Sequence, residues 1–286
     1  MSQFSEKDFD AINYADFRPT YSIEFYKKMN EYHEGEKNLL IDVGCGPGTA
    51  TLQLVNLLKF KKTIGTDISK PMVDGGNNLK QKDSNVEFLV SSGEDFQFLG
   101  EEFNAKKVDM ITAAECVHYI GFNIFQENCW KNLRKNGTLA IWGYVNPTIA
   151  GHPKVDKISF DYFYSADKFG PYWQQPGGKI ISNLLQDCKW DETKYKDIKN
   201  VVMFARDYGT GVNEDELYFG CSSTPEGLRR YFTTTSFYHG WKKDHPNEKD
   251  LSESFLEEVL AACPDLKANS KVQIVFDTFY MFARAI

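Results

Sequence analysis

Residues 39–50 read LLIDVGCGPGTA, and this stretch decides the fold of the chain. An apolar run ends at Asp42, and glycines then stand at alternate positions before helix-forming residues resume at Thr49; they are Gly44, Gly46 and Gly48. This order predicts a buried strand, a tight turn and the start of a helix. Glycine allows a positive φ or the close approach of a ligand, and a helix N-terminus carries unpaired N–H groups with partial positive charge. We therefore expect a nucleotide-like ligand with an anionic end to bind over this turn.

The spacing of these glycines indicates which ligand binds. A dinucleotide site has the pattern G-x-G-x-x-G, with the pyrophosphate on the helix N-terminus, whereas the pattern here is D-x-G-x-G-x-G. An acid two residues before the first glycine suits a ligand whose amino-acid end carries an ammonium group. The pattern resembles the first motif of class I S-adenosylmethionine (SAM) methyltransferases. A dinucleotide site and a glycine-rich turn without a ligand are the alternatives.

The composition indicates a soluble globular protein with an ample core, since 42% of the 286 residues are apolar and 15% are aromatic. A net charge of −7 argues against nucleic acid or an anionic membrane as a partner. The six cysteines never form C-x-x-C, so we expect neither a metal site nor a dithiol pair. No basic and apolar leader or long apolar stretch is present. These features predict a cytoplasmic protein with reduced cysteines, and we expect a monomer or weak dimer.

Strand and helix patterns alternate through the first half of the chain. Strands are predicted at residues 39–42, 63–67, 86–90, 108–113 and 138–144, and helices at residues 22–32, at residues 49–59, from the capping residue Ser69 onward, and from Phe122 to a stop at Asn136-Gly137. Strands separated by helical segments imply right-handed βαβ crossovers and a parallel sheet covered on both faces. The fold class is therefore α/β, a doubly wound, mostly parallel, Rossmann-like sheet of seven strands.

The alternation stops beyond Pro147. Strands are predicted at residues 198–208 and 271–284, and helices at residues 179–187, 224–241 and 252–263. We interpret these strands as closing the same sheet, with the helical inserts forming a lid over its ligand edge. The chain is then one domain, residues 1–286. It comprises an N-terminal cap at residues 1–37, a SAM-binding core at residues 38–147, and closing strands with substrate-lid inserts at residues 148–286.

Ligands of open α/β sheets lie beyond the carboxyl ends of the strands, so residues that follow the first four strands should line one pocket. A carboxylate at Asp67 can accept both ribose hydroxyls, the turn after the third strand can hold an adenine edge, and backbone after the fourth strand can approach the ligand. Helix caps are the alternative for the acids, and Cys45 suits a space-filling role better than that of a nucleophile. The predicted cofactor residues are Asp42, Gly44, Cys45, Gly46, Gly48, Asp67, Ile68, Ser92, Gly93, Glu94, Ala114 and Glu115, with Tyr14 from the N-terminal segment.

Further motifs carry a resemblance over nearly the whole chain. The order of the glycine turn, Asp67, the Gly-Glu-Asp turn, VDMITAAECVHY at residues 108–119 and LRKNGT at residues 133–138 resembles a SAM-dependent methyltransferase. Outside this core, Tyr14, the RPTY of residues 18–21, the IWGY of residues 141–144, the GPYWQQPG of residues 170–177 and the TFY of residues 278–280 resemble fungal trans-aconitate methyltransferases. Tyr119 stands where that family is expected to have a tryptophan.

This resemblance implies methyl transfer from SAM to a carboxylate of a small polycarboxylic acid such as trans-aconitate, leaving S-adenosylhomocysteine. An ionised carboxylate needs no general base, so we predict no catalytic base. The anionic substrate requires donors, and arginine is best suited to them. The predicted acceptor-positioning residues are Arg18, Tyr21, His118, Trp173, Arg229 and Tyr238, with Lys179 and Arg230 as further candidates. The alternatives are a hydroxyl acceptor with His118 as base, and a non-catalytic SAM-binding module.

Overall fold

The computed structural model describes residues 18–82, 85–213 and 217–286, and these contain one sheet in the order β3-β2-β1-β4-β5-β8-β6, with β7 paired to β8. The strands are β1 (Leu39–Val43), β2 (Lys62–Asp67), β3 (Val86–Val90), β4 (Val108–Ala114), β5 (Leu133–Ile149), β6 (Tyr195–Met203), β7 (Gly220–Ser223) and β8 (Val272–Ala285). The first five strands run parallel and β8 is antiparallel to β5, β6 and β7. The doubly wound α/β fold is confirmed, and the short β7 makes the sheet eight-stranded instead of seven-stranded.

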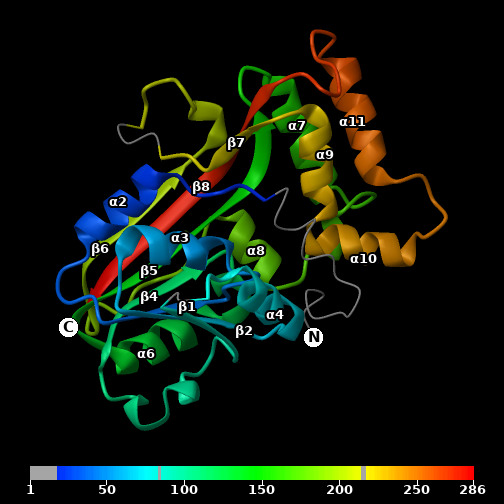
Figure 1. The fold of residues 1–286 in the computed structure, drawn as a ribbon. Coiled ribbons are helices and arrows are strands. Elements are labelled where there is room, and N and C mark those ends of the chain that lie inside the picture. Colours follow the sequence, from blue (N-terminus) through cyan, green and yellow to red (C-terminus); the bar gives the residue numbers. More distant parts are fainter. Residues whose placement is uncertain (1–17, 83–84, 214–216) are drawn as a thin grey trace.

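Helices and one 3₁₀ turn connect the parallel strands, and further helices lie beside the upper end of β5 (Figure 1). They are α2 (Ile23–Tyr32), α3 (Thr49–Leu58), α4 (Lys70–Leu79), α5 (Val117–Ile120), α6 (Phe122–Asn132), α7 (Pro153–Tyr164), α8 (Gly177–Ser182), α9 (Pro225–Thr233), α10 (Ser236–Asp244) and α11 (Leu251–Ala262), with 3₁₀ turns η2 (Gln97–Glu102), η3 (Gly170–Tyr172) and η4 (Ala205–Asp207). Helices α7 and α9 to α11 gather at one end of the molecule (Figure 1). No helix of the described segments is long and apolar enough to span a membrane.

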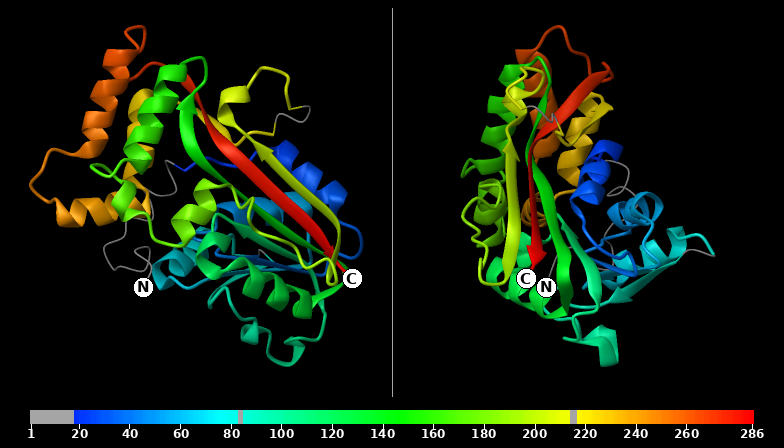
Figure 2. Two further views of the ribbon diagram at one scale, coloured as in Figure 1. Left: turned by 180° about the vertical axis from the view of Figure 1, so that it is seen from behind. Right: turned by 90° about the vertical axis from the view of Figure 1, so that its left-hand side faces the viewer.

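Alternate residues of the central strands pack into two apolar cores, one on each face of the sheet. Leu40, Met110 and Trp142 point to one face of the sheet, where they join residues of α2 and α3. Ile41 and Ile111 point to the other face, where they join residues of α6 and α8. Figure 2 shows the sheet edge-on, with α2 and α3 in blue on one side. Because side chains of a strand alternate between faces, a buried run such as Leu39–Val43 supplies both cores at once.

Helix α2 anchors the N-terminal segment to the sheet. The Ser22 side chain caps the helix by accepting a hydrogen bond from Phe25 N. Phe25 is fully buried, and its ring lies 5.3 Å from that of Trp142 and 5.0 Å from that of Phe219. These packed rings hold the residues just before α2 beside the end of β5.

Several boundaries differ from the sequence-based predictions: the strand predicted at residues 198–208 is β6 (Tyr195–Met203), and the helix predicted at residues 179–187 is α8 (Gly177–Ser182). Two further differences have a clear local cause. The helix predicted at residues 224–241 is two helices, α9 and α10, because Thr235 leaves the first helix and caps the second by accepting from Tyr238 N. The helix predicted to stop at Asn136-Gly137 ends at Asn132, because Leu133 already pairs with β4 as the start of β5. Tertiary strand pairing overrides the local stop pattern there.

Replacing Phe25 by alanine should lower the free energy of unfolding by about 3–5 kcal/mol, because it leaves a cavity among aromatic rings that cannot collapse fully. Urea unfolding followed by circular dichroism measures this change. Ile23→Ala on the same helix is the matched control: Ile23 is 52% exposed, and its replacement should change the free energy of unfolding by less than about 0.5 kcal/mol. Equal effects of the two variants would contradict the assigned packing.

Candidate active site

A cavity of about 660 Å³ lies at the carboxyl ends of β1, β2 and β4 and beside the turn after β3. We call it the glycine-turn cavity. Its lining includes most of the predicted cofactor residues, which the structure brings together from four separate turns: Gly44, Gly46, Asp67, Ile68, Ser92, Gly93, Glu94, Ala114 and Glu115. Residues that sequence reasoning missed also line it: Val43, Met72, Ser91, Cys116, Tyr119, Ile120, Gln174 and Gln175. Tyr14 lies outside the described residues.

Asp67 holds the glycine turn in shape while facing the cavity. Its Oδ2 accepts a hydrogen bond from Gly46 N at 2.9 Å, and its Oδ1 accepts from Ser69 N at 2.8 Å. Burial raises the pKa of Asp67, although these backbone donors oppose the rise. Gly46 has a φ of +55° with open space where a Cβ would stand, so a ligand can approach its backbone closely.

Three predicted cofactor residues of the glycine turn support it from behind instead of lining the cavity. Asp42 is fully buried, and its two oxygens accept from Thr51 Oγ1 and Thr112 Oγ1, each at 2.6 Å. Cys45 packs into the apolar cluster with Phe88. Gly48 caps α3 with a φ of +90°. The expectation that Asp42 receives the ammonium end of the ligand is therefore corrected, because its carboxylate is directed into the protein.

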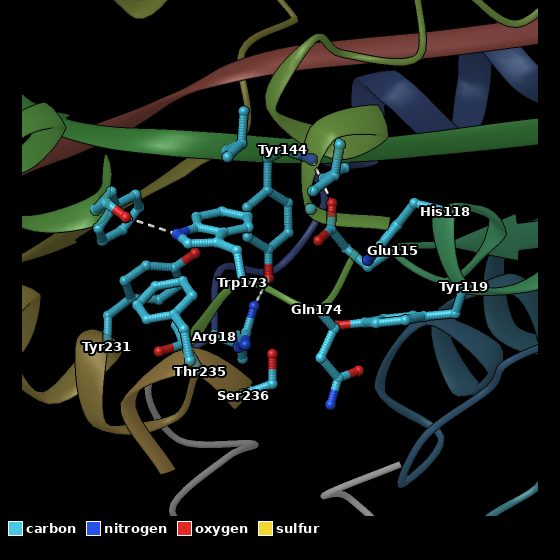
Figure 3. A pocket seen from close by; sticks show the side chains of 15 residues that line it. Arg18, Glu115, His118, Tyr119, Tyr144, Trp173, Gln174, Tyr231, Thr235 and Ser236 are labelled. Carbon is cyan, nitrogen blue, oxygen red and sulfur yellow. Dashed lines mark hydrogen bonds between the residues drawn. The ribbon is translucent and has the colours of Figure 1, made fainter. Parts of the chain in front are cut away.

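A second, smaller cavity of about 70 Å³ adjoins the first, and we call it the Arg18 pocket (Figure 3). Glu115, Tyr119 and Gln174 line both cavities. The remaining lining residues come from the segment before α2, from α5, β5 and α7, from the η3–α8 region and from α9 and α10: Arg18, His118, Tyr144, Val145, Phe163, Trp173, Gly178, Ile181, Tyr231, Thr235, Ser236 and Phe237. The shared wall means that a ligand in one cavity lies next to a ligand in the other.

Arg18 is held in this pocket by contacts to three residues, one on β5 and two at the C-terminal end of α9. Its Nη2 donates to the Thr234 carbonyl at 3.1 Å, and its Nη1 donates to Tyr144 Oη at 3.4 Å. Its guanidinium carbon lies 5.1 Å from the centre of the Tyr231 ring. The structure thus places the predicted acceptor residue Arg18 in a pocket beside the glycine-turn cavity (Figure 3).

Glu115 and His118 are titratable groups of the pocket wall. Burial raises the pKa of Glu115 to about 7, against the opposing effects of the hydrogen bond from Tyr144 N and the charge of Arg18. Burial, reinforced by the charge of Arg18, lowers the pKa of His118 to about 3. His118 is therefore neutral at pH 7, and its ring lies 4.1 Å from that of Tyr119.

The other predicted acceptor residues lie elsewhere, except Trp173. Trp173 lines the pocket and donates from Nε1 to the Phe163 carbonyl at 2.6 Å. Tyr21 is packed in the core, 5.5 Å from the Trp142 ring. We withdraw the remaining assignments because these side chains have other partners or face solvent: Arg229 binds Glu226 and Ser252, Tyr238 binds Asp250, Arg230 is ion-paired on the surface, and Lys179 is exposed.

Sequence reasoning missed the hydroxyl-bearing residues of the pocket, Tyr144, Tyr231, Thr235 and Ser236. A signal existed for Tyr144, since it ends the IWGY stretch that carries the family resemblance. No such signal existed for the residues of α9 and α10, because their orientation depends on the break at Thr234 and Thr235.

Comparisons with known proteins identify the family. The methyltransferase domain family matches residues 40–137. A Saccharomyces cerevisiae protein described as a probable S-adenosylmethionine-dependent methyltransferase is 25% identical, over 99% of this chain and 98% of its own. A Dictyostelium discoideum protein described as a "putative methyltransferase" is 30% identical, over 66% of this chain and 67% of its own. The chain belongs to the SAM-dependent methyltransferases.

Solved structures show that the methyltransferase fold extends beyond the matched residues 40–137. The structure of a "putative type II methyltransferase" from Anaeromyxobacter dehalogenans superposes with a TM-score of 0.66 at 15% identity, over 94% of this chain and 97% of that one. Haemonchus contortus phosphoethanolamine N-methyltransferase 2, solved with S-adenosylhomocysteine, superposes with a TM-score of 0.51 at 14% identity, over 99% of this chain and 59% of that one. SAM is the cofactor of this methyltransferase, and membership of the family favours an enzyme over a non-catalytic module.

The buried Asp42 makes the stability of this methyltransferase depend on pH. Burial raises its pKa from 3.8 to about 6, so the folded state keeps this proton longer than the unfolded state does. The contribution of Asp42 to the free energy of unfolding is therefore greatest below about pH 4 and is lost as the pH rises through 6. The loss is on the order of 3 kcal/mol, at about 1.4 kcal/mol per pKa unit.

Asp42→Asn should flatten this decline, as measured by urea unfolding at several pH values between about 4 and 7. Asp74→Asn, which removes an exposed carboxylate paired with Lys70, is the matched control and should keep the wild-type slope. An Asp42→Asn variant that retains the full decline would show that another group is responsible.

Proposed function

We propose that this methyltransferase esterifies a carboxylate of a small polycarboxylic acid such as trans-aconitate. The observation that carries the proposal is a guanidinium, that of Arg18, held in a small pocket that shares a wall with the glycine-turn cavity. Among the pocket-lining residues that the structure describes, Arg18 alone carries a permanent positive charge. An arginine in an aromatic pocket favours an anion of small size as its partner.

The placement of SAM in the glycine-turn cavity is part of this proposal. The volume of about 660 Å³ is in the usual range for a ligand of this size. We assign the adenosine to the side lined by Asp67, Ile68 and the Ser92–Glu94 turn, and the methionine part to the side lined by Gly44 and Gly46. Asp67 keeps carboxylate lone pairs for ribose hydroxyls beyond its two backbone partners. Glu115, Tyr119 and Gln174 then lie between donor and acceptor.

The groups around Arg18 suit a carboxylate acceptor. A planar guanidinium can grip a carboxylate through two parallel hydrogen bonds, and its contacts to Thr234 and Tyr144 fix its plane in advance. The hydroxyls of Thr235 and Ser236 line the same pocket and offer donors to a second carboxylate. The aromatic rings of Phe163, Trp173 and Phe237 give the rest of the pocket an apolar lining.

The main task of the protein in this reaction is to align the two reacting groups. SAM supplies an electrophilic methyl group, which bonds to the carboxylate oxygen while the sulfur leaves with the electrons of its broken bond. The carboxylate is already ionised at neutral pH, so no side chain has to remove a proton. Holding the reacting groups in line in a dry site can supply about 7–11 kcal/mol. The absence of a predicted catalytic base is therefore compatible with the proposed reaction.

A hydroxyl acceptor is the second candidate function, with His118 as the base that removes its proton. His118 does line the Arg18 pocket. However, a pKa lowered to about 3 makes its imidazole a weak proton acceptor near neutral pH. The lowered pKa of His118 therefore favours a carboxylate acceptor over a hydroxyl acceptor.

Incubation with SAM and trans-aconitate should yield a monomethyl ester that alkali hydrolyses, detected by mass spectrometry. Arg18→Ala should lower kcat/KM by roughly a hundredfold, because a charged partner of the acceptor is lost, and Arg18→Lys should recover only part of it since lysine lacks the bidentate fork. Arg230→Ala removes a surface arginine outside the pocket and is the matched control. It should keep wild-type activity.

Two outcomes would contradict the carboxylate proposal. One is the lack of any ester over a panel of di- and tricarboxylic acids when SAM binds normally. The other is turnover of hydroxyl compounds that His118→Ala abolishes, which would instead support the second candidate function.

A further inference from the structure

Glu115 lies between the two substrate sites. Its side chain lines both the glycine-turn cavity and the Arg18 pocket. Its Oε1 accepts a hydrogen bond from Tyr144 N, while the hydroxyl of the same tyrosine accepts from Arg18 Nη1 at 3.4 Å. The carboxyl and the guanidinium are therefore tied to the two ends of one tyrosine (Figure 3), and they attract each other electrostatically.

The backbone and a neighbouring residue are adapted to this position of the carboxyl group. Glu115 has a φ of +57°, a left-handed conformation that is uncommon outside glycine. A Cβ on Gly143 would collide with Glu115 Oε1, so the lack of a side chain at Gly143 leaves room for the carboxyl group. A strained residue that neighbouring contacts hold in place is typical of functional sites.

A carboxyl group beside an anion site affects what that site can bind. An ionised Glu115 competes with an incoming carboxylate for the attraction of Arg18 and also repels it. Two carboxylates that share one site cannot both ionise freely, so one of them takes up a proton. Burial already raises the pKa of Glu115 to about 7, which places this proton uptake within the physiological range.

We propose that Glu115 is a specificity-determining residue that takes up one proton when a carboxylate acceptor reaches Arg18, and thereby couples acceptor binding to the loss of its own charge. The inference rests on the proposed function, because it assumes an anionic acceptor. The sulfonium charge of SAM favours ionised Glu115 before the acceptor arrives. The acceptor carboxylate then replaces the Glu115 carboxylate as the counter-ion of Arg18.

Few other titratable or charged groups face this junction in the described part of the chain. They are Arg18 before α2, Cys116, His118 and Tyr119 in and beside α5, Tyr144 on β5, and Tyr231 on α9, while the acids Asp67 and Glu94 line the glycine-turn cavity but not the Arg18 pocket. Burial keeps the thiol of Cys116 and the imidazole of His118 neutral, since it raises the pKa of the first and lowers that of the second. Glu115 is therefore the group whose charge changes near neutral pH beside Arg18.

The test is isothermal titration calorimetry of trans-aconitate binding to the protein saturated with S-adenosylhomocysteine, in two buffers of different ionisation enthalpy. The acid is already ionised above about pH 6, so proton uptake reports on the protein. A group with a pKa of about 7 is about three-quarters ionised at about pH 7.5. At this pH the wild type should therefore take up about 0.5–0.8 proton per bound acid, and Glu115→Gln should take up none. Glutamine keeps an oxygen that can accept the hydrogen bond from Tyr144 N, which favours retention of the fold.

Steady-state kinetics provide a second readout that a purely structural role would not change. The wild-type KM for the acid should rise about tenfold between about pH 6 and pH 8.5, while that of Glu115→Gln stays level. Asp156→Asn is the matched control: burial raises the pKa of Asp156 too, but it lines a separate cavity. This variant should show the wild-type proton uptake and KM profile.

The outcomes separate this inference from the proposed function. Acid binding without proton uptake by the wild type, or uptake that persists in Glu115→Gln, overturns the role of Glu115 and leaves the esterification standing. Proton-coupled binding without formation of an ester supports Glu115 but overturns the proposed reaction. If the acid does not bind at all, both proposals fail. If the Glu115→Gln protein does not fold, the calorimetry of the wild type decides whether acid binding is coupled to proton uptake.

Discussion

The hydrogen bonds of the buried Asp42 are the interaction on which the cofactor site depends. Two threonine hydroxyls bind its carboxylate at 2.6 Å, one from Thr51 on α3 and one from Thr112 on β4. They join β1 to its neighbouring strand and to the helix that follows the glycine turn, so the turn has fixed ends. The hydrogen bond from Gly46 N to Asp67 then fixes its middle. A buried acid with strong partners thus makes the turn rigid from behind and leaves the backbone of the turn facing the cavity in front.

The sequence was sufficient to predict the fold and most of the residues that line the glycine-turn cavity. Both depend on local patterns, namely apolar strands that end in polar turns, and the parallel topology brings those turns to one edge. This is why Asp67, the Ser92–Glu94 turn and Glu115 line one cavity. The assignment of Asp42 failed because a fully buried strand such as Leu39–Val43 carries no polar alternation that would show which way a side chain points.

The acceptor side was much harder to predict because it is assembled from distant segments. Arg18 reaches Thr234 across 216 residues of sequence, and Tyr144 across 126. Whether a side chain such as Arg229 faces the pocket depends on the end of α9 and the start of α10, which local propensity places poorly. Arg18 was found because a motif pointed to it, whereas Arg229 and Tyr238 were proposed on residue type alone. Arg229 instead pairs with Glu226 on its own helix, and Tyr238 donates to Asp250, the N-cap residue of α11.

The distribution of charge across the two cavities gives a physical reason for their shared wall. The glycine-turn cavity is lined by the acids Asp67, Glu94 and Glu115, which suit a cationic donor. The Arg18 pocket suits an anionic acceptor. The two proposed reactants carry opposite charges and attract each other, but the acid between them weakens that attraction as long as it stays ionised. A carboxyl group that loses its charge as the acceptor arrives resolves this conflict. Before the acceptor binds, the ionised carboxylate in the shared wall attracts the cationic donor. Once the acceptor is bound, the protonated carboxyl group no longer repels the anion.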